Sequence, residues 1–316
     1  MKENLHTTIA FILLLAFIPC LAYLTPEGTS SAKADDITVG VYFTKEKKCV
    51  DYSLEEYVIG AVMAQMPADF ETEALKAQAV LARSYIIRRY QSEKESPTPA
   101  LHGSLISDDE NLYQSFFTDE QAKDFYGEGY SAARDRITKA VRSAKGILTY
   151  KGEPVIAAYH AASSGYTESA KTAWGQDIPY LKSVKSENDA KLKGIETVTT
   201  LSLDEFDKLV YRHYGISTGG SAQPLTTSAN KHGYVTSLSI CGSQADVQEF
   251  ISLMEIASPC FEFEIKDGNI IFTAKGFGHM VGMSQYGANL MALDGADYKE
   301  ILAYYYKNVK LSAAEV

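Results

Sequence analysis

The stretch SLEEYVIGAVMAQMPADFETEALKAQAVLARSYIIRRY, residues 53–90, decides the fold. It opens with a Ser-x-x-Glu capping box at Ser53, which predicts a helix over residues 53–66. Pro67 ends that helix, because proline cannot continue it. Residues 70–90 then carry apolar side chains on nearly every side of a helical projection. A helix that is apolar all round is buried, so the pattern predicts two helices with the second at the centre of the molecule.

Two polar residues in this stretch stand out. On a projection of about 100° per residue, Gln65 lies between Leu54 and Val58, inside the apolar stripe of the first helix. A carboxamide there needs hydrogen-bond partners, so it either bonds to backbone at the edge of the core or opens into a cleft. Glu73 lies in the first turn of the second helix, where a carboxylate also stabilises the helix dipole.

Outward from the helix pair, short strands and helices alternate without an internal repeat. Strands are expected over residues 37–43, 147–150, 155–160, 234–241, 261–265 and 270–274, and helices over 132–144, 203–214 and 247–254, with two more after residue 287. The strands at 147–150 and 155–160 are expected to form a hairpin, and residues 108–129 to be irregular. The predicted class is α+β, with mixed helices and antiparallel strands around a central groove.

Composition excludes several classes of protein. The chain has 316 residues, of which 46% are hydrophobic and 22% charged, which is typical of a globular protein and not of a disordered or disulfide-stapled one. Its formal net charge is −10 and no basic patch offsets the excess of acid. We therefore expect no nucleic-acid partner, since such binding depends on positive charge.

The N-terminus predicts export. Residues 7–24 form an apolar run of about 18 residues, near the lower limit for a membrane-spanning helix. Ala32-Lys33-Ala34 has the form of a signal-peptidase site but lies far beyond the run. Residues 1–25 are therefore interpreted as an uncleaved single-pass membrane anchor, with a cleaved signal sequence and secretion as the alternative. Residues 26–36 are a linker, and residues 37–316 form the extracytoplasmic domain.

The four cysteines give no metal motif. Cys20 lies in the apolar run, and Cys49, Cys241 and Cys260 are far apart in the chain, without a Cys-x-x-Cys pair. Two alternatives stay open for the exported cysteines, a Cys241–Cys260 bridge or free buried thiols.

Three long motifs carry a resemblance. They are MAQMPADFETEALKAQAVLARSY at residues 63–85, YHAASSGYTE at 159–168 followed by Trp174-Gly175 and Pro179-Tyr180-Leu181, and GHMVGMSQYGA at 278–288. In order and spacing they resemble the motifs of the stage II sporulation protein D and amidase enhancer family. The resemblance covers roughly residues 50–290, with the N-terminal family motif region at about 50–150.

This resemblance implies a peptidoglycan lytic transglycosylase that acts on denuded glycan strands during spore engulfment, at the cell membrane and facing the intermembrane space. One carboxylic acid protonates the glycosidic oxygen, and the 6-hydroxyl of the muramic acid closes onto C1 to leave a 1,6-anhydro end. The implied partners are peptidoglycan glycan strands, a peptide-stripping amidase or endopeptidase, and other engulfment membrane proteins. No cofactor is implied.

The chain departs from the family at the expected acid. That acid is the glutamate of a Glu-Met-Pro triplet, and the matching residue here is Gln65, which has no proton to donate. General acid catalysis contributes roughly 10²–10⁴-fold, so the change bears on function. Three interpretations follow: Glu73 is the working acid, the chain is a weakened or inactive glycan-binding or amidase-enhancing protein, or Gln65 is an engineered substitution.

A second departure concerns metal. Some family members carry a Cys and a His-Cys pair that hold zinc before a Gln-x-Tyr motif. Aligned on Gln114 and Phe116, the matching residues here are Ser107, Leu112 and Tyr113. These do not form a zinc ligand set, so we expect no metal.

The resemblance also places a glycan groove. Its catalytic candidates are Gln65 and Glu73. The residues expected to bind substrate are Tyr159, His160, Ser163, Thr167, His279, Ser284, Gln285 and Tyr286. A lone loop histidine is more often structural, but the resemblance favours both histidines at the groove rim, where they bond to sugar or hold loops. A groove of this kind requires the junction of the first two helices to meet the loops that carry the histidines.

Overall fold

The computed structural model describes residues 37–314 apart from positions 220 and 222. The anchor or signal sequence predicted for residues 1–25 and the linker predicted for 26–36 lie outside the described residues. Among the helices that are described, none is both long and apolar enough to cross a membrane.

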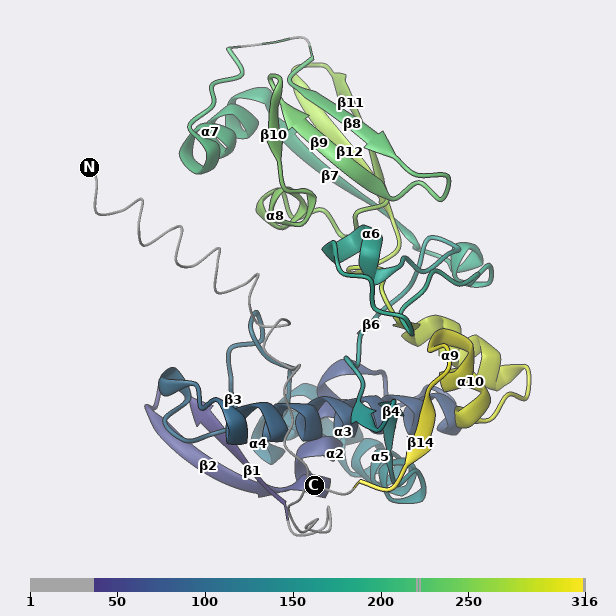
Figure 1. The fold of residues 1–316 in the computed structure, drawn as a ribbon. Helices are drawn as coiled ribbons and strands as arrows, with labels where there is room; N and C mark the ends of the chain where they lie inside the picture. The colour runs from purple at the N-terminus through teal and green to yellow at the C-terminus, as the bar shows by residue number, and fades with distance from the viewer. Residues whose placement is uncertain (1–36, 220, 222, 315–316) are drawn as a thin grey trace.

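Figure 1 shows a helical part and a sheet part connected by loops. The helices of the helical part are α2 (Leu54–Gln65), α3 (Thr72–Glu95), α4 (Asp119–Tyr126), α5 (Tyr130–Ser143), α9 (Gln285–Leu293) and α10 (Tyr298–Tyr305). Its strands are β1 (Thr38–Phe43), β2 (Lys48–Ser53), β3 (Ile106–Ser107), β4 (Ile147–Tyr150), β5 (Glu153–Pro154) and β14 (Lys310–Ser312). The connecting region holds β6 (Tyr159–His160), α6 (Ala170–Trp174) and β13 (Met283–Ser284). Single 3-10 turns are η2 (Pro99–Leu101), η3 (Gly127–Gly129) and η4 (Asp189–Lys191).

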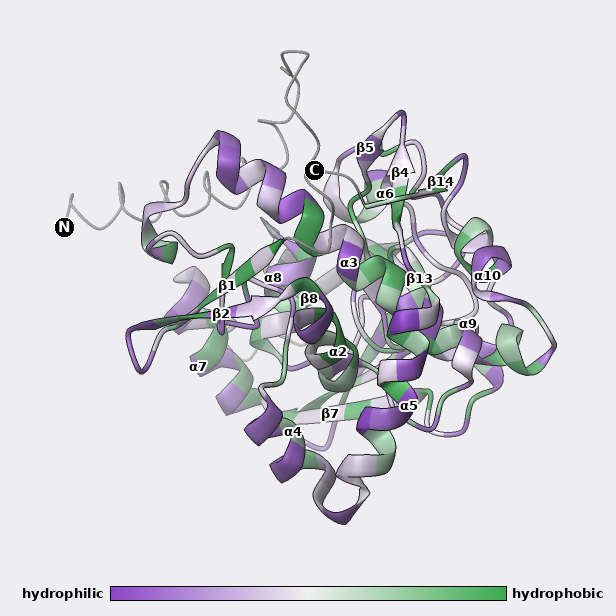
Figure 2. Cartoon of the chain, turned by 90° about the horizontal axis from the view of Figure 1, so that it is seen from below, coloured by the Kyte–Doolittle hydropathy of each residue, from purple (hydrophilic) through white to green (hydrophobic). Residues whose placement is uncertain are grey.

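The predicted helix pair is confirmed. The Ser53 hydroxyl caps α2 by accepting a hydrogen bond from the Glu56 amide, and α2 ends at Gln65, just before Pro67. Helix α3 is buried over most of its length and contacts α2, α5, α9 and α10. Figure 2 shows hydrophobic residues toward the middle of this part and hydrophilic ones on its outer turns. The small side chains of α3 let these neighbours approach closely.

Polar side chains of α3 are satisfied within the core. The Arg83 guanidinium donates to the backbone carbonyls of Ala144 at 2.7 Å and Gly146 at 3.2 Å. The Ser84 hydroxyl accepts from the Leu148 amide at 2.8 Å. These bonds fix α3 against β4 and orient the groove-lining residues that follow on the helix.

Two sequence predictions about local structure were wrong. Residues 108–129, expected to be irregular, contain α4, which starts at a capping box formed by Thr118 and Gln121. The strand expected over residues 155–160 forms only at Tyr159–His160, as β6, and the hairpin partner of β4 is instead β5. Strand β5 ends at Pro154, whose carbonyl accepts a hydrogen bond from Arg88, and the chain then pairs through β6 with β13 in parallel.

The sheet part has its own apolar core. Its strands are β7 (Glu196–Ser202), β8 (Leu225–Ala229), β9 (Val235–Ile240), β10 (Ser243–Ala245), β11 (Phe261–Lys266) and β12 (Asn269–Lys275), and its helices are α7 (Leu203–Tyr214) and α8 (Val247–Leu253). Two antiparallel sheets, ordered β11-β12-β7 and β10-β9-β8, cover a core rich in phenylalanine. The predicted β11–β12 hairpin is confirmed, with Asp267 and Gly268 in left-handed turn conformations. The described chain is α+β, as predicted.

Candidate functional site

A groove of about 740 Å³ lies where the helical part meets the connecting loops. The C-terminal half of α3 and segments within residues 110–115 and 153–161 form its walls. Gln65, Trp174, His279 and Gln285 complete the lining. The end of α2 and the two histidine loops, which the sequence predicted to share one cleft, therefore do meet there.

Gln65 lies at the C-terminal end of α2, at the edge of the groove. Its side-chain nitrogen donates to the Ser115 carbonyl at 2.5 Å. Its side-chain oxygen accepts from the Tyr159 hydroxyl, and also from the Gln78 amide at 3.4 Å. Both alternatives left open by the sequence hold at once, since the carboxamide bonds to backbone and faces a cleft.

A polar network extends from Gln65 into the core. Gln114 donates to the Tyr159 hydroxyl at 2.7 Å and accepts from the buried Tyr57 hydroxyl. Gln285 donates to the Gln65 backbone carbonyl at 3.0 Å and to the Gln78 side chain at 3.3 Å. Burial raises the pKa of Tyr159 above its usual value, so its hydroxyl stays a neutral donor. The network therefore holds the side chain at position 65 in one orientation.

The geometry at position 65 suits a neutral group. The Ser115 carbonyl is an acceptor only, so the atom that faces it at 2.5 Å must carry a hydrogen. The amide of Gln65 meets this requirement, and so would a protonated carboxylic acid. An ionised carboxylate would place two acceptors in contact, which disfavours the charged form. The contact with the Ser115 carbonyl thus favours a group at position 65 that carries a hydrogen.

His160 and His279 lie on two adjacent loops of the groove, with ring centroids 5.9 Å apart. The His160 Nδ1 lies 3.2 Å from the Val281 carbonyl, and the His279 Nδ1 accepts from the Val281 amide. Burial, with a smaller contribution from His279, lowers the pKa of His160 to about 3, and burial lowers that of His279 to about 4. Both imidazoles are therefore neutral near pH 7 and can exchange hydrogen bonds but not provide charge. The ring centroids of Trp174 and His279 are 5.5 Å apart, and Trp174 adds an indole face to the groove.

Close backbone contacts hold the two histidine loops together. A side chain at Gly282, whose φ is +77°, would collide with the Ala158 carbonyl, and one at Gly278 would crowd His160. Met280 has a φ of 67° and packs its buried side chain against Tyr234 and Cys260. The contacts at Gly278 and Gly282 set the distance between the two histidine loops.

Four of the expected substrate-binding residues do not line the groove. Ser163, Thr167 and Ser284 are buried, and their bonds build the loops beneath it. The Ser163 amide donates to Asp189, Thr167 bonds to Val184 through both its amide and hydroxyl, and Ser284 caps α9. Tyr286 is partly exposed and packs edge-to-face on Phe70 outside the lining. The groove does contain Tyr159, His160, His279 and Gln285.

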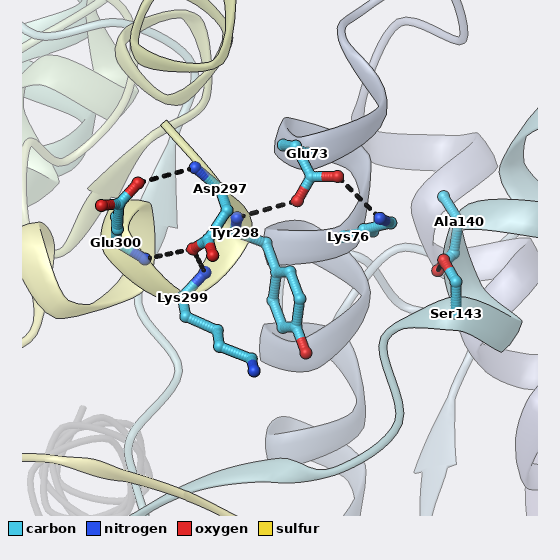
Figure 3. Close-up of polar contacts among 8 residues, drawn as sticks. All are labelled: Glu73, Lys76, Ala140, Ser143, Asp297, Tyr298, Lys299 and Glu300. Carbon is cyan, nitrogen blue, oxygen red and sulfur yellow. Dashed lines mark hydrogen bonds and ion pairs between the residues drawn. The ribbon is translucent and has the colours of Figure 1, made fainter. Parts of the chain in front are cut away.

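Glu73 also lies outside the groove lining. One carboxylate oxygen accepts from the Tyr298 amide at 3.0 Å, and the other pairs with Lys76 at 2.6 Å (Figure 3). Tyr298 is the first residue of α10, so Glu73 stabilises the start of that helix. Its contacts are those of a structural carboxylate.

Sequence analysis missed five charged residues of the groove. They are Arg88, Arg89, Glu95, Glu110 and Glu153. Arg88, Arg89 and Glu95 recur with Tyr85 at helical spacing on one face of α3, which was the available signal. Glu110 accepts a hydrogen bond from the Ser115 hydroxyl, and the Ser115 backbone carbonyl accepts one from the Gln65 side chain. Ser115 therefore links Glu110 to Gln65. No local pattern marks Glu110 or Glu153.

The described residues contain no group of three His, Cys, Asp or Glu side chains placed to hold a metal ion. Cys49, Cys241 and Cys260 are free thiols, so the Cys241–Cys260 bridge is not formed. The alternative of free buried thiols holds for Cys260, whereas Cys49 and Cys241 are exposed. Burial raises the pKa of the Cys260 thiol to about 11.

Comparison with known proteins places the chain in a family. A family model described as "Stage II sporulation protein" matches residues 42–150. The chain belongs to the stage II sporulation protein D family, as the sequence motifs predicted.

Individual relatives extend the match over most of the chain. The stage II sporulation protein D of Bacillus subtilis (strain 168) is 36% identical over 294 residues, which is 92% of this chain and 83% of the relative. That of Bacillus amyloliquefaciens is 39% identical over 293 residues, with the same coverage. The amidase enhancer of B. subtilis is 27% identical over 80% of this chain and 40% of its own length.

Proposed function

We propose that this chain is a sporulation protein that binds the glycan strands of peptidoglycan in the groove beside Gln65. The observation that carries the proposal is the lining of the groove. It combines carboxamide, phenol, imidazole and indole groups, which suit the hydroxyls and flat faces of sugars. Kinship with stage II sporulation protein D supports a role during spore engulfment.

Binding without cleavage is the activity that the site favours. Gln65 has no proton to donate, and Glu73 is committed to Tyr298 and Lys76 outside the groove. The side chains that bond directly to Gln65, those of Tyr159 and Gln78, are neutral hydrogen-bonding groups, which can hold a sugar but are not carboxylic acids. The amidase-enhancing role named for one relative is consistent with a protein that presents glycan to another enzyme.

The test compares the full chain with Gln65→Glu on denuded glycan strands. Wild type should bind the strands and release no product, whereas the variant should also yield 1,6-anhydro ends detectable by mass spectrometry. A gain of roughly 10²–10⁴-fold over wild type is expected of a general acid. The acid at position 65 should have a raised pKa, so activity should persist at neutral pH. Absence of glycan binding by wild type would refute the proposal.

Lytic transglycosylation by the wild-type chain is the second candidate, and Glu110 is the observation that favours it. Glu110 lines the groove and bonds to Ser115, whose carbonyl holds Gln65. It could protonate the leaving oxygen and then take the proton of the attacking 6-hydroxyl. If wild type yields anhydro ends, Glu110→Gln should abolish them, while the matched groove variants Glu95→Gln and Glu153→Gln should retain them.

We further propose that the chain is held at the cell membrane by residues 1–25, with the domain facing the intermembrane space. A peptide-stripping amidase or endopeptidase and other engulfment membrane proteins would be its partners. Fractionation of sporulating cells, followed by high-salt extraction, distinguishes the membrane-held form from the secreted alternative. Pretreatment of sacculi with an amidase should increase binding of the chain.

A further inference from the structure

The charges in the groove are unevenly compensated. The Arg89 guanidinium pairs with Glu93 at 2.5 Å, donates to the Leu105 carbonyl and lies 5.3 Å from the Tyr113 ring centroid. Its charge is therefore neutralised by a carboxylate on the same helix turn. The two groove histidines are neutral.

Arg88 differs from its neighbour. It lines the groove, and its Nη1 donates to the Pro154 carbonyl at 2.8 Å. A carbonyl is a neutral acceptor, so the charge of Arg88 remains. No carboxylate of the described residues lies within ion-pair distance of it. A guanidinium has five N–H donors, and only one of them is engaged by the Pro154 carbonyl.

Three carboxylates share the groove with Arg88, and they limit where an anion can bind. Glu95, Glu110 and Glu153 are part of the lining, and Glu110 is bonded to Ser115. Each repels a second carboxylate. An anionic group on a ligand is therefore stable in this groove only where it meets Arg88, which fixes the register of the ligand.

We propose that Arg88 determines specificity by binding the lactyl carboxylate of a peptide-free muramic acid in the glycan strand. This inference rests on the proposed function. Arginine is suited to the task because its planar fork matches a carboxylate with two parallel hydrogen bonds. When a stem peptide is attached, the same carboxylate becomes a neutral amide and the pair is lost. The residue thus gives a chemical reason for a preference for denuded strands.

The position of Arg88 makes this a distal subsite. Gln78 contacts Gln65, and Arg88 lies ten residues further along α3, about 15 Å at a rise of roughly 1.5 Å per residue. The muramic acid that Arg88 binds is then not the sugar beside Gln65. Its loss should change affinity and ligand choice and leave the hydrogen-bond network at position 65 intact.

The test measures binding of three probes to the full chain in detergent. They are a GlcNAc-MurNAc oligomer with free lactyl carboxylates, the same oligomer with those carboxylates converted to methylamides, and a GlcNAc oligomer of equal length. Wild type should bind the free acid roughly 10- to 100-fold more tightly than the amide, as for a charge-assisted hydrogen bond. Arg88→Gln should remove this preference and leave GlcNAc oligomer binding unchanged. Arg88→Lys should keep part of the preference for the free acid, because lysine retains the positive charge but lacks the planar guanidinium that makes two parallel hydrogen bonds.

The control is Arg142→Gln, which removes an exposed arginine of α5 outside the groove lining and should alter none of the three affinities. Equal binding of acid and amide by wild type, or a preserved preference in Arg88→Gln, would overturn the inference while leaving the proposed glycan binding intact. An equal loss for all three probes would also overturn it, because Arg88 would then only support the Pro154 loop. Failure of wild type to bind any probe would remove both proposals.

Discussion

The helical part and the sheet part bury different kinds of side chain. In the helical part, buried amides and a buried guanidinium are hydrogen-bonded, as at Gln78, Arg83, Gln114 and Gln285. The core of the sheet part is apolar and built on phenylalanines. Buried polar groups cost free energy unless each is satisfied. Both parts bury an apolar core, and the helical part in addition holds hydrogen-bonded polar groups where they face the groove.

The largest expected effect comes from the sheet core. Phe272→Ala removes a ring that packs 5.9 Å from both Phe250 and Phe261, and should lower the free energy of unfolding by about 3–5 kcal/mol. Urea unfolding measures this, and the folded variant should keep its glycan affinity. The matched control is Val198→Ala, since Val198 is 64% exposed on β7. A loss of glycan affinity in folded Phe272→Ala would show that the two parts are not separate in role.

Gln78→Ala tests the buried polar network of the helical part. It removes the donor to the Gln65 oxygen and the acceptor for Gln285, so stability should fall by about 1–3 kcal/mol. Unlike Phe272→Ala, it should also weaken glycan binding, because the carboxamide at position 65 loses its orientation. Isothermal titration with denuded glycan measures the affinity, with exposed Gln223→Ala as control. Unchanged affinity would mean that the network serves only the core.

The groove histidines should make stability depend on pH. The pKa values of His160 and His279 are lowered to about 3 and about 4, so the folded state binds fewer protons than the unfolded state between these values and about 6.5. Stability should be full well above pH 6.5 and decline as pH falls toward 4, with a combined loss for the two histidines on the order of 1–2 kcal/mol already at pH 6. Melting temperature against pH measures the decline. His279→Gln should reduce the slope; an identical slope would contradict the assignment.

The smallest effect is expected at Glu73. Glu73→Gln loses a partly exposed ion pair with Lys76 and keeps an acceptor for the Tyr298 amide, so stability should change by less than about 1 kcal/mol. Glycan affinity should be unchanged, and any cleavage by wild type should persist. Loss of cleavage without a change in melting temperature would instead identify Glu73 as the acid.

The sequence predicted what is encoded locally. The α2–α3 pair, the β11–β12 hairpin and α7 follow from capping residues, helical periodicity and a turn signal within a few residues of each element. Family motifs then indicated Gln65, Tyr159 and the two histidines, which do meet in the groove.

What could not be predicted depends on contacts between distant segments. The bond from Tyr159 to Gln65 joins residues 94 positions apart, and the parallel β6–β13 pair joins two-residue strands too short to give a periodic signal. Ser163, Thr167 and Ser284 belong to the same motifs as the groove residues, but the turns that carry them point them into the loops. A sequence motif does not distinguish residues that line the groove from residues that hold the surrounding loops in place.

The β6–β13 pair has a consequence for biogenesis. One wall of the groove is held by Met283, Ser284 and Gln285, near the end of a chain whose other wall is made from α3. If the chain is exported and binds glycan as proposed, a polypeptide whose last segment has not yet crossed the membrane lacks the groove wall that residues 283–285 hold. The proposed glycan-binding surface would then be complete only near the end of export.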